Sequence, residues 1–123
     1  MRERRVYLVR HGQTEYNATG RMQGQLDTDL SQVGVQQAKV TAQMLGDKRI
    51  ARVISSDLRR AYDTALILAE PFGCEVTTDV RLRETDLGQW QGASREDVDR
   101  EFPGQRAYWR HDPQWAPPGG ETR

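Results

Sequence analysis

The chain has 123 residues, 36% hydrophobic and 29% charged, which is enough for one folded domain and too little for two hydrophobic cores. Eighteen Lys and Arg residues balance eighteen Asp and Glu residues, and this zero net charge argues against a nucleic-acid or anionic-membrane partner. No apolar run approaches the twenty or so residues of a membrane span, and the single cysteine, Cys74, cannot close an internal disulfide. We therefore expect one domain, residues 1–123, located in the cytoplasm.

The N-terminal third predicts a strand, a long loop and a helix. Residues 6–9 form a continuous apolar run, which is typical of a strand buried in a parallel sheet. Residues 12–30 lack a sustained period and predict a long loop with one helical turn, a length that is often functional. Ser31 is the predicted N-cap of a helix whose apolar face recurs at helical spacing until Gly46 ends it.

The middle of the chain repeats this pattern. Residues 50–55 predict a second buried strand, and helical spacing then runs from Leu58 until Pro71 ends the helix. Residues 76–78 predict a short third strand. The order strand, helix, strand, helix, strand predicts an α/β fold, with a mainly parallel sheet flanked by helices on both faces.

The C-terminal part predicts one more helix and then a turn. Ser94 and Asp97 resemble a capping box, which predicts a brief helix ending near Phe102. The chain is rich in Trp and Pro from Gln105 onward. Residues 117–121 predict a turn followed by the start of a helix, and we expect that the chain is truncated there.

The first candidate functional residue is His11, in the sequence Arg10-His11-Gly12 directly after the first predicted strand. Ligands of open α/β sheets bind at the carboxyl ends of strands. A neutral imidazole is a good nucleophile, a guanidinium pairs with phosphate oxygens, and glycine lets a ligand approach the backbone. These residues suit attack on a phosphoryl group, whereas the alternative, a solvated histidine at a strand end, is more frequent for a single motif.

Two further segments supply candidate charges. Arg59 and Arg60 lie in the first turn of a predicted helix, where free N–H groups already attract anions, but adjacent helical residues cannot both face one site. After the third strand, Glu84 and Asp86 are both candidate proton donors to a leaving oxygen. The alternative for these two carboxylates is a surface salt bridge with Arg81 or Arg83.

Together these segments closely resemble the histidine phosphatase superfamily, also called phosphoglycerate-mutase-like. The resemblance runs in the family's order from the first predicted strand to the last residue, and four ordered motifs are far more specific than one. The motifs are residues 8–14 (LVRHGQT) with Asn17, 55–65 (SSDLRRAYDTA), 82–84 (LRE) with Gly88, Trp90 and Gly92, and 118–121 (PGGE).

The resemblance implies a role for each matched residue. His11 would become phosphohistidine, and Glu84 would donate the proton to the leaving group. Arg10 and Arg60 would hold the phosphoryl oxygens, which leaves Arg59 at the surface and gives Asp86 a structural role. Two loop residues would assist phosphate or substrate binding, and they are Asn17 and Gln23.

The family resemblance further implies a phosphomonoester hydrolase that acts on a small phosphorylated metabolite without cofactor. No group of residues has metal-ligand spacing, so we expect no metal, and arginines would supply the positive charge. The other histidine, His111, matches no catalytic position of the family and is expected at the surface. The compact segment 87–92 is similar to the small phosphatases of the family, and a homodimer is compatible with the sequence.

The chain departs from the family after residue 121. Family members continue with a long helix and a strand ending in a second His-Gly, and that strand separates the first two strands of the sheet. We therefore expect residues 1–123 alone to be inactive and poorly folded, because strand edges at 6–9 and 50–55 would be unpaired. Two alternatives remain: a phosphoglycerate mutase, and a non-catalytic partner module if 123 residues is the natural length.

Overall fold

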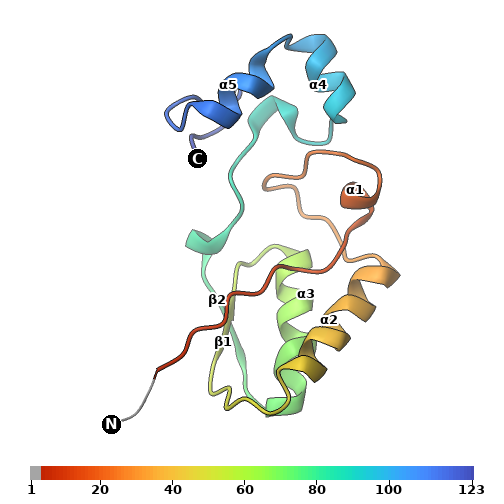
Figure 1. Ribbon diagram of the computed structural model, residues 1–123, viewed down its shortest axis with the longest axis vertical. Helices are drawn as coiled ribbons and strands as arrows, with labels where there is room; N and C mark the ends of the chain where they lie inside the picture. Colours follow the sequence, from red (N-terminus) through yellow and green to blue (C-terminus); the bar gives the residue numbers. More distant parts are fainter. Residues whose placement is uncertain (1–3) are drawn as a thin grey trace.

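A computed structural model describes residues 4–123 as an elongated molecule with elements gathered at its two ends (Figure 1). One end holds the sheet strands β1 and β2 with helices α2 and α3, the other end holds α4 and α5, and α1 lies between them. The helices are α1 (Glu15–Ala18), α2 (Gln32–Met44), α3 (Arg59–Ala69), α4 (Arg95–Glu101) and α5 (Gln105–His111). The strands are β1 (Val53–Ser55) and β2 (Val76–Thr78), and short 3₁₀ helices span Glu70–Phe72, Val80–Leu82 and Gly88–Trp90.

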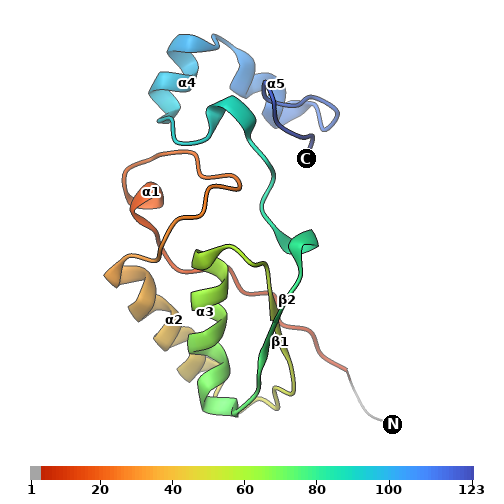
Figure 2. The ribbon, with the colours of Figure 1, turned by 180° about the vertical axis from the view of Figure 1, so that it is seen from behind.

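The central unit is β1–α3–β2, which confirms the predicted α/β class. The two strands are parallel and hydrogen-bonded, with Val53 opposite Val76 and Ser55 opposite Thr78. Helix α3 packs against both strands and against α2, as the view from behind also shows (Figure 2). Strand β2 has the predicted bounds, whereas β1 is shorter than the predicted strand at residues 50–55.

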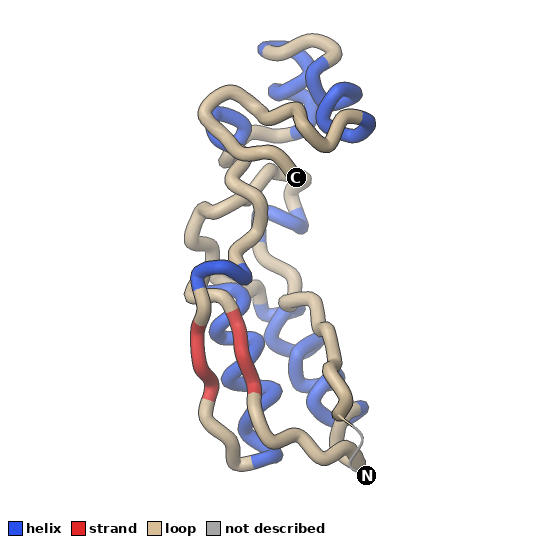
Figure 3. Tube along the Cα trace, turned by 90° about the vertical axis from the view of Figure 1, so that its left-hand side faces the viewer, coloured by secondary structure: helices blue, strands red, loops and turns tan. Residues whose placement is uncertain are grey.

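The prediction of a strand at residues 6–9 is wrong for the described structure. These residues are loop, and Figure 3 draws them apart from the two strands. A strand needs a hydrogen-bonded neighbour, and within residues 4–123 no strand pairs with this segment. Val6 is 84% and Leu8 95% exposed, so the apolar pattern that predicted burial is present without the element that would bury it.

The helices were predicted more accurately than the strand at residues 6–9, because local sequence signals set most helix ends. Ser31 caps α2 by accepting a hydrogen bond from the N–H of Gly34, and the single helical turn expected in the long loop is α1. Ser94 Oγ accepts from the N–H of Asp97 at the start of α4, which is half of the predicted capping box. The turn predicted within residues 117–121 is present, with the N–H of Gly120 donating to the carbonyl of Pro117 at 2.8 Å, but no helix begins after it within the described residues.

Helix α5 was not predicted because packing, and not a local signal, stabilises it. Its N-cap position is Gly104, which offers no side chain to cap the helix. Instead Trp109 packs edge-on against Trp90, with 5.8 Å between ring centroids, and Trp90 also contacts Trp115 at 5.6 Å.

The described residues form two small apolar clusters, one at each end, whereas the sequence predicted a single hydrophobic core. The first joins α2 and α3 through buried small and aliphatic residues, which are Ala38, Ala42, Ala65, Leu68 and Ala69. The second surrounds Trp90, Leu87 and Val98, with partly buried Met22, Phe102, Trp109 and Trp115 packed against them. Segment 83–93 connects the two ends, and it carries the third predicted motif.

Candidate active site

His11 lies half-buried where the N-terminal segment reaches the first turn of the long loop. Its Nδ1 atom is 2.6 Å from the carbonyl oxygen of Gly12, which can only accept a hydrogen bond. Nδ1 therefore carries the proton, and in the neutral ring Nε2 keeps its lone pair free. Burial is the main cause that lowers the pKa of His11, and the charges of Arg60 and Arg10 lower it further. The neutral, nucleophilic form is thus favoured near neutral pH.

Two helices hold the backbone just after this histidine. The N–H of Gly12 donates to Thr64 Oγ1 of α3 at 3.1 Å, and the same hydroxyl donates to the carbonyl of Arg60 at 2.7 Å. On the other side Gly12 lies against Gly34 of α2, where a Cβ on Gly12 would overlap the Gly34 carbonyl oxygen. The loop is therefore fixed between α2 and α3, and glycine is required at the contact.

Arg60 is a buried cation at the start of α3, only 2% exposed. Its Nη1 donates to Leu26 O and its Nη2 to Gly24 O, both at 2.5 Å, and Nη1 also contacts Thr28 Oγ1 at 3.2 Å. Burial lowers the pKa of Arg60, while the charges of Glu84 and Asp27 raise it. No carboxylate forms an ion pair with Arg60 within residues 4–123, and the contacts above leave its Nε–H and one N–H of Nη2 to donate elsewhere.

Arg59, the neighbouring arginine, faces solvent as the family pattern implied. Its Nη1 pairs with Asp29 at 3.2 Å, and its backbone N–H donates to Asp27 Oδ1 at 2.7 Å. The structure therefore separates the two arginines, with Arg60 inside and Arg59 outside.

Glu84 lies in the segment that connects the two ends of the molecule. Its charge raises the pKa of His11 and of Arg60, which places the carboxylate within electrostatic reach of both. Among the residues that the structure describes, its Oε1 accepts only from the adjacent N–H of Thr85, at 2.9 Å, and its own carbonyl accepts from Gln25 Nε2 at 3.2 Å. Arg10 is exposed, and its charge also acts on His11. The charges of Arg10, Arg60 and Glu84 therefore all act on the pKa of His11.

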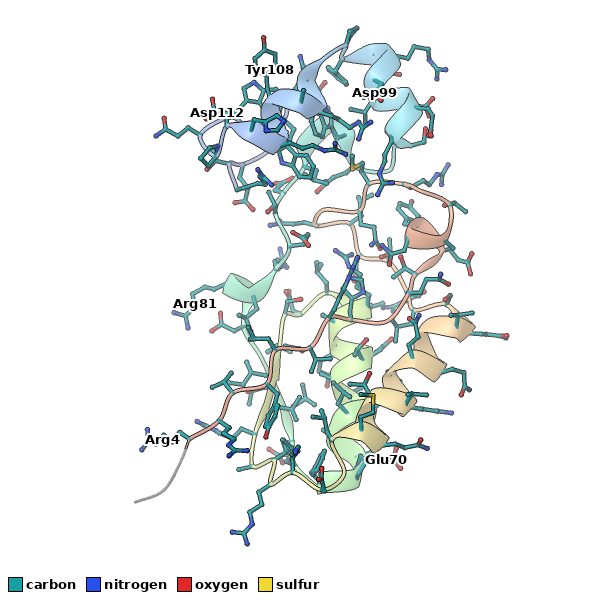
Figure 4. The ribbon with its side chains drawn as sticks, viewed as in Figure 1. Arg4, Glu70, Arg81, Asp99, Tyr108 and Asp112 are labelled. Carbon is teal, nitrogen blue, oxygen red and sulfur yellow. The ribbon has the colours of Figure 1, made fainter. Side chains whose placement is uncertain are left out.

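The alternative salt bridges of Glu84 and Asp86 with the nearby arginines do not occur. Arg83 instead binds Asp57 through two hydrogen bonds of 2.6 and 2.7 Å, and it lowers the pKa of that aspartate. Arg81 pairs with Asp79, and Figure 4 shows its side chain pointing away from the rest of the protein. Asp86 Oδ1 accepts from the N–H of Gly88 in its own turn.

The two loop residues differ in how they are held. Gln23 is buried, and its Oε1 accepts from Thr14 Oγ1 and Thr28 Oγ1, both at 2.6 Å. Only its Nε2 group remains to donate to a ligand. Asn17 is exposed, and its Oδ1 accepts from the N–H of Thr14 and caps α1. Phosphate binding by Asn17 and Gln23 stays a prediction.

Among the described residues, neither the second histidine nor a metal-binding cluster adds to this site. His111 is exposed at the end of α5, as expected. Across residues 4–123 no three His, Cys, Asp or Glu side chains lie so that they could hold a metal ion. In the same range no helix is long and apolar enough to cross a membrane.

Comparison with known proteins identifies the class that this fold and site define. The chain belongs to the histidine phosphatase superfamily (branch 1), whose family model matches residues 6–123. This confirms the resemblance read from the four motifs.

Among individual relatives, the chain is 54% identical over all 123 residues to the glucosyl-3-phosphoglycerate phosphatase of Mycobacterium tuberculosis, of which it covers 55%. It is 53% identical over 83 residues, 68% of this chain, to a protein of Serratia proteamaculans named probable phosphoglycerate mutase GpmB, of which it covers 39%. The chain thus spans little more than half the length of the relatives that match it throughout.

Two solved phosphatase structures are similar to this chain. A mycobacterial glucosyl-3-phosphoglycerate phosphatase complexed with VO3 is similar with a TM-score of 0.88 and 54% identity, over 91% of this chain and 54% of that one. The α-ribazole phosphatase of Shigella flexneri is similar with a TM-score of 0.81 and 30% identity, over 93% of this chain and 57% of that one.

Sequence reasoning missed two residues that hold this site, Thr64 and Gln91. Thr64 lies one turn after Arg60 on the buried face of α3, and a polar residue at i+4 from a candidate ligand was a usable signal. Gln91 Oε1 accepts from the backbone N–H of Gln25 at 2.8 Å and of Leu87 at 3.3 Å, which ties the loop to the Glu84 segment. Contacts between residues this far apart in sequence leave no local pattern.

Proposed function

We propose that this chain contributes the nucleophile, two arginines and the proton donor of a phosphomonoester hydrolase that acts on a small phosphorylated metabolite. The observation that carries the proposal is the state of His11. Its Nδ1–H donates to Gly12, its Nε2 has no hydrogen-bond partner among residues 4–123, and its neighbours Arg10 and Arg60 are cations. This combination suits attack on a phosphoryl dianion.

The proposed reaction has two steps. Nε2 of His11 attacks phosphorus, the bond from phosphorus to the leaving oxygen breaks, and Glu84 gives that oxygen a proton. Water then attacks the phosphohistidine with Glu84 as base, which releases inorganic phosphate and restores the imidazole. Arg10 and Arg60 stabilise the charge on the phosphoryl oxygens, and we propose that they do so in place of a metal ion.

For the substrate we propose glucosyl-3-phosphoglycerate, because relatives with that printed activity match the chain along its whole length. A cytoplasmic location suits such a metabolite. The second candidate is phosphoglycerate mutase activity, which is favoured by the matches named GpmB over 68% of this chain. The two candidates differ in whether water or a second hydroxyl receives the phosphoryl group from His11.

The test uses the full-length gene product. We expect release of inorganic phosphate from glucosyl-3-phosphoglycerate, unchanged by a metal chelator, and no conversion of 3-phosphoglycerate to its 2-isomer. His11→Ala should lower kcat by about 10³-fold or more, while His111→Ala should leave it unchanged. Isomerisation without net release of phosphate would favour the mutase, and activity that survives His11→Ala would refute the proposed nucleophile.

A further inference from the structure

The PGGE motif at residues 118–121 contacts the segment that carries Glu84. The N–H of Glu121 donates to the carbonyl of Asp86 at 2.9 Å, and Glu121 Oε1 accepts from the N–H of Asp86 at 2.7 Å. The N–H of Gln89 donates to the carbonyl of Pro118 at 2.8 Å. Three hydrogen bonds therefore join the motif to residues 86–89, and one of them uses the Glu121 carboxylate.

The two backbones lie so close that both contact positions require glycine. A Cβ on Gly120 would lie 2.5 Å from the carbonyl oxygen of Asp86, and a Cβ on Gly88 would overlap the carbonyl oxygen of Pro118. Gly88 also has a φ of 55°, which other residues rarely adopt. The contact explains Gly120 in the motif, and the φ of 74° at Gly119, which other residues rarely adopt, explains the glycine before it.

Glu84 depends on such contacts because it lies in a connection without helix or strand. On its N-terminal side Arg83 is bound to Asp57 by two hydrogen bonds. On its C-terminal side the next anchored residue is Asp86, held by Glu121. Among residues 4–123 the Glu84 side chain accepts only from the adjacent N–H of Thr85, so its position follows from the flanking anchors and from the hydrogen bond that Gln25 donates to the Glu84 carbonyl.

We propose that Glu121 is a positioning residue for Glu84, which holds the proton donor in place through the backbone of Asp86. This inference rests on the proposed role of Glu84 as proton donor. Without the Glu121 carboxylate the N–H of Asp86 loses its acceptor, and the Glu84 segment loses one of the three hydrogen bonds that join it to residues 118–121. Loss of Glu121 should therefore impair the same step as loss of Glu84, and less severely.

A positioning role is separated from general damage to the enzyme by how strongly kcat depends on the leaving group of the substrate. Alkyl phosphates need a proton on the leaving oxygen, whereas p-nitrophenyl phosphate has a good leaving group and needs little help. Values of kcat for glycerol 3-phosphate and p-nitrophenyl phosphate would be compared in the full-length protein. The reference variant is Glu84→Gln, which should lower the alkyl-to-aryl ratio of kcat by about 10²-fold or more.

We expect Glu121→Ala to lower this ratio by about 10-fold and Glu121→Gln to restore most of it, because the amide oxygen still accepts from Asp86. The matched control Glu101→Ala removes an exposed carboxylate of α4 and should leave the ratio unchanged. If Glu121→Ala does not fold, Glu121→Asp is used instead. Its side chain is one methylene shorter, so it should also lower the alkyl-to-aryl ratio of kcat.

An equal loss on both substrates in the Glu121 variants would overturn the positioning role, and so would no loss. An unchanged ratio in Glu84→Gln would instead refute the proposed proton donor. The two failures are therefore distinguishable.

Discussion

The chemistry of His11 depends on a few neighbours that fix both its tautomer and its charge. The carbonyl of Gly12 selects the Nδ1–H tautomer, while burial and two arginines disfavour the imidazolium. Because the pKa of His11 is lowered, protonation of the ring begins at a lower pH than for a free histidine. The nucleophilic form therefore persists as the pH falls through 6.5.

The first prediction concerns this titration. Nuclear magnetic resonance of His11 in the full-length protein should give a pKa below 6.5. Arg10→Gln should raise that pKa, because it removes one of the positive charges that lower it. A pKa at or above 6.5 in the unsubstituted protein, or a further decrease in Arg10→Gln, would contradict this electrostatic description.

The second prediction concerns Thr64, which accepts the N–H next to His11. Thr64→Val keeps the shape but leaves the Gly12 N–H without its acceptor, so kcat should fall about 10-fold. The matched control is Thr41→Val in α2, because Thr41 also donates to the carbonyl four residues earlier but does not contact the loop. Equal kcat values for the two variants would rule out a special role for Thr64.

The individual site residues show what sequence can and cannot predict. His11, Arg60 and Glu84 stand in local motifs, and the structure brings their charges together. That Arg60 would be buried and Arg59 exposed required the family pattern, because helical geometry alone left the choice open. Thr64 and Glu121 lie within the family motifs, but the contacts of Thr64, Gln91 and Glu121 with partners 30 or more residues away are not revealed by any local pattern.

Elements with local end signals were predicted well, and elements that depend on a partner were not. Helix α2 begins after its N-cap Ser31, and α3 begins after the second strand, as predicted. Helix α5 depends on Trp109 packing against Trp90, and residues 6–9 have no neighbouring strand in the described structure. Propensity gives only a weak expectation where tertiary contacts decide.

The contact between α2 and residues 12–13 gives the third prediction. A Cβ at Gly34 would overlap the backbone of Gln13, so Gly34→Ala should cost about 1–3 kcal/mol of stability although alanine is the better helix former. Thermal or urea unfolding of the full-length protein measures this cost. Gln36→Ala, at an exposed position of the same helix, should not destabilise, and a neutral Gly34→Ala would mean that the loop can move away freely.

At the scale of the whole molecule, apolar residues are exposed both on the N-terminal segment and on strand β1. Val6 and Leu8 are 84% and 95% exposed, and Ile54 of β1 is 54% exposed. Exposed apolar residues beside an unpaired strand are prone to self-association. The sequence-based expectation that residues 1–123 fold poorly by themselves agrees with this surface.

The fourth prediction tests that expectation directly. Residues 1–123 expressed alone should self-associate and lack a cooperative thermal transition, as measured by light scattering and calorimetry. Leu8→Lys should increase the monomer fraction, because a charge protects an open edge, while Val33→Lys on α2 should not. A monomeric segment that melts cooperatively would contradict the prediction.

The central claim is that His11 receives a phosphoryl group, and the most direct measurement is to trap that intermediate. The full-length protein, mixed with a labelled phosphomonoester and quenched in base, should carry phosphate that is stable to base, labile to acid, and located at His11 by mass spectrometry. The His11→Ala variant should carry none. Hydrolysis of the substrate with no label on His11, or with label on another residue, would contradict the account.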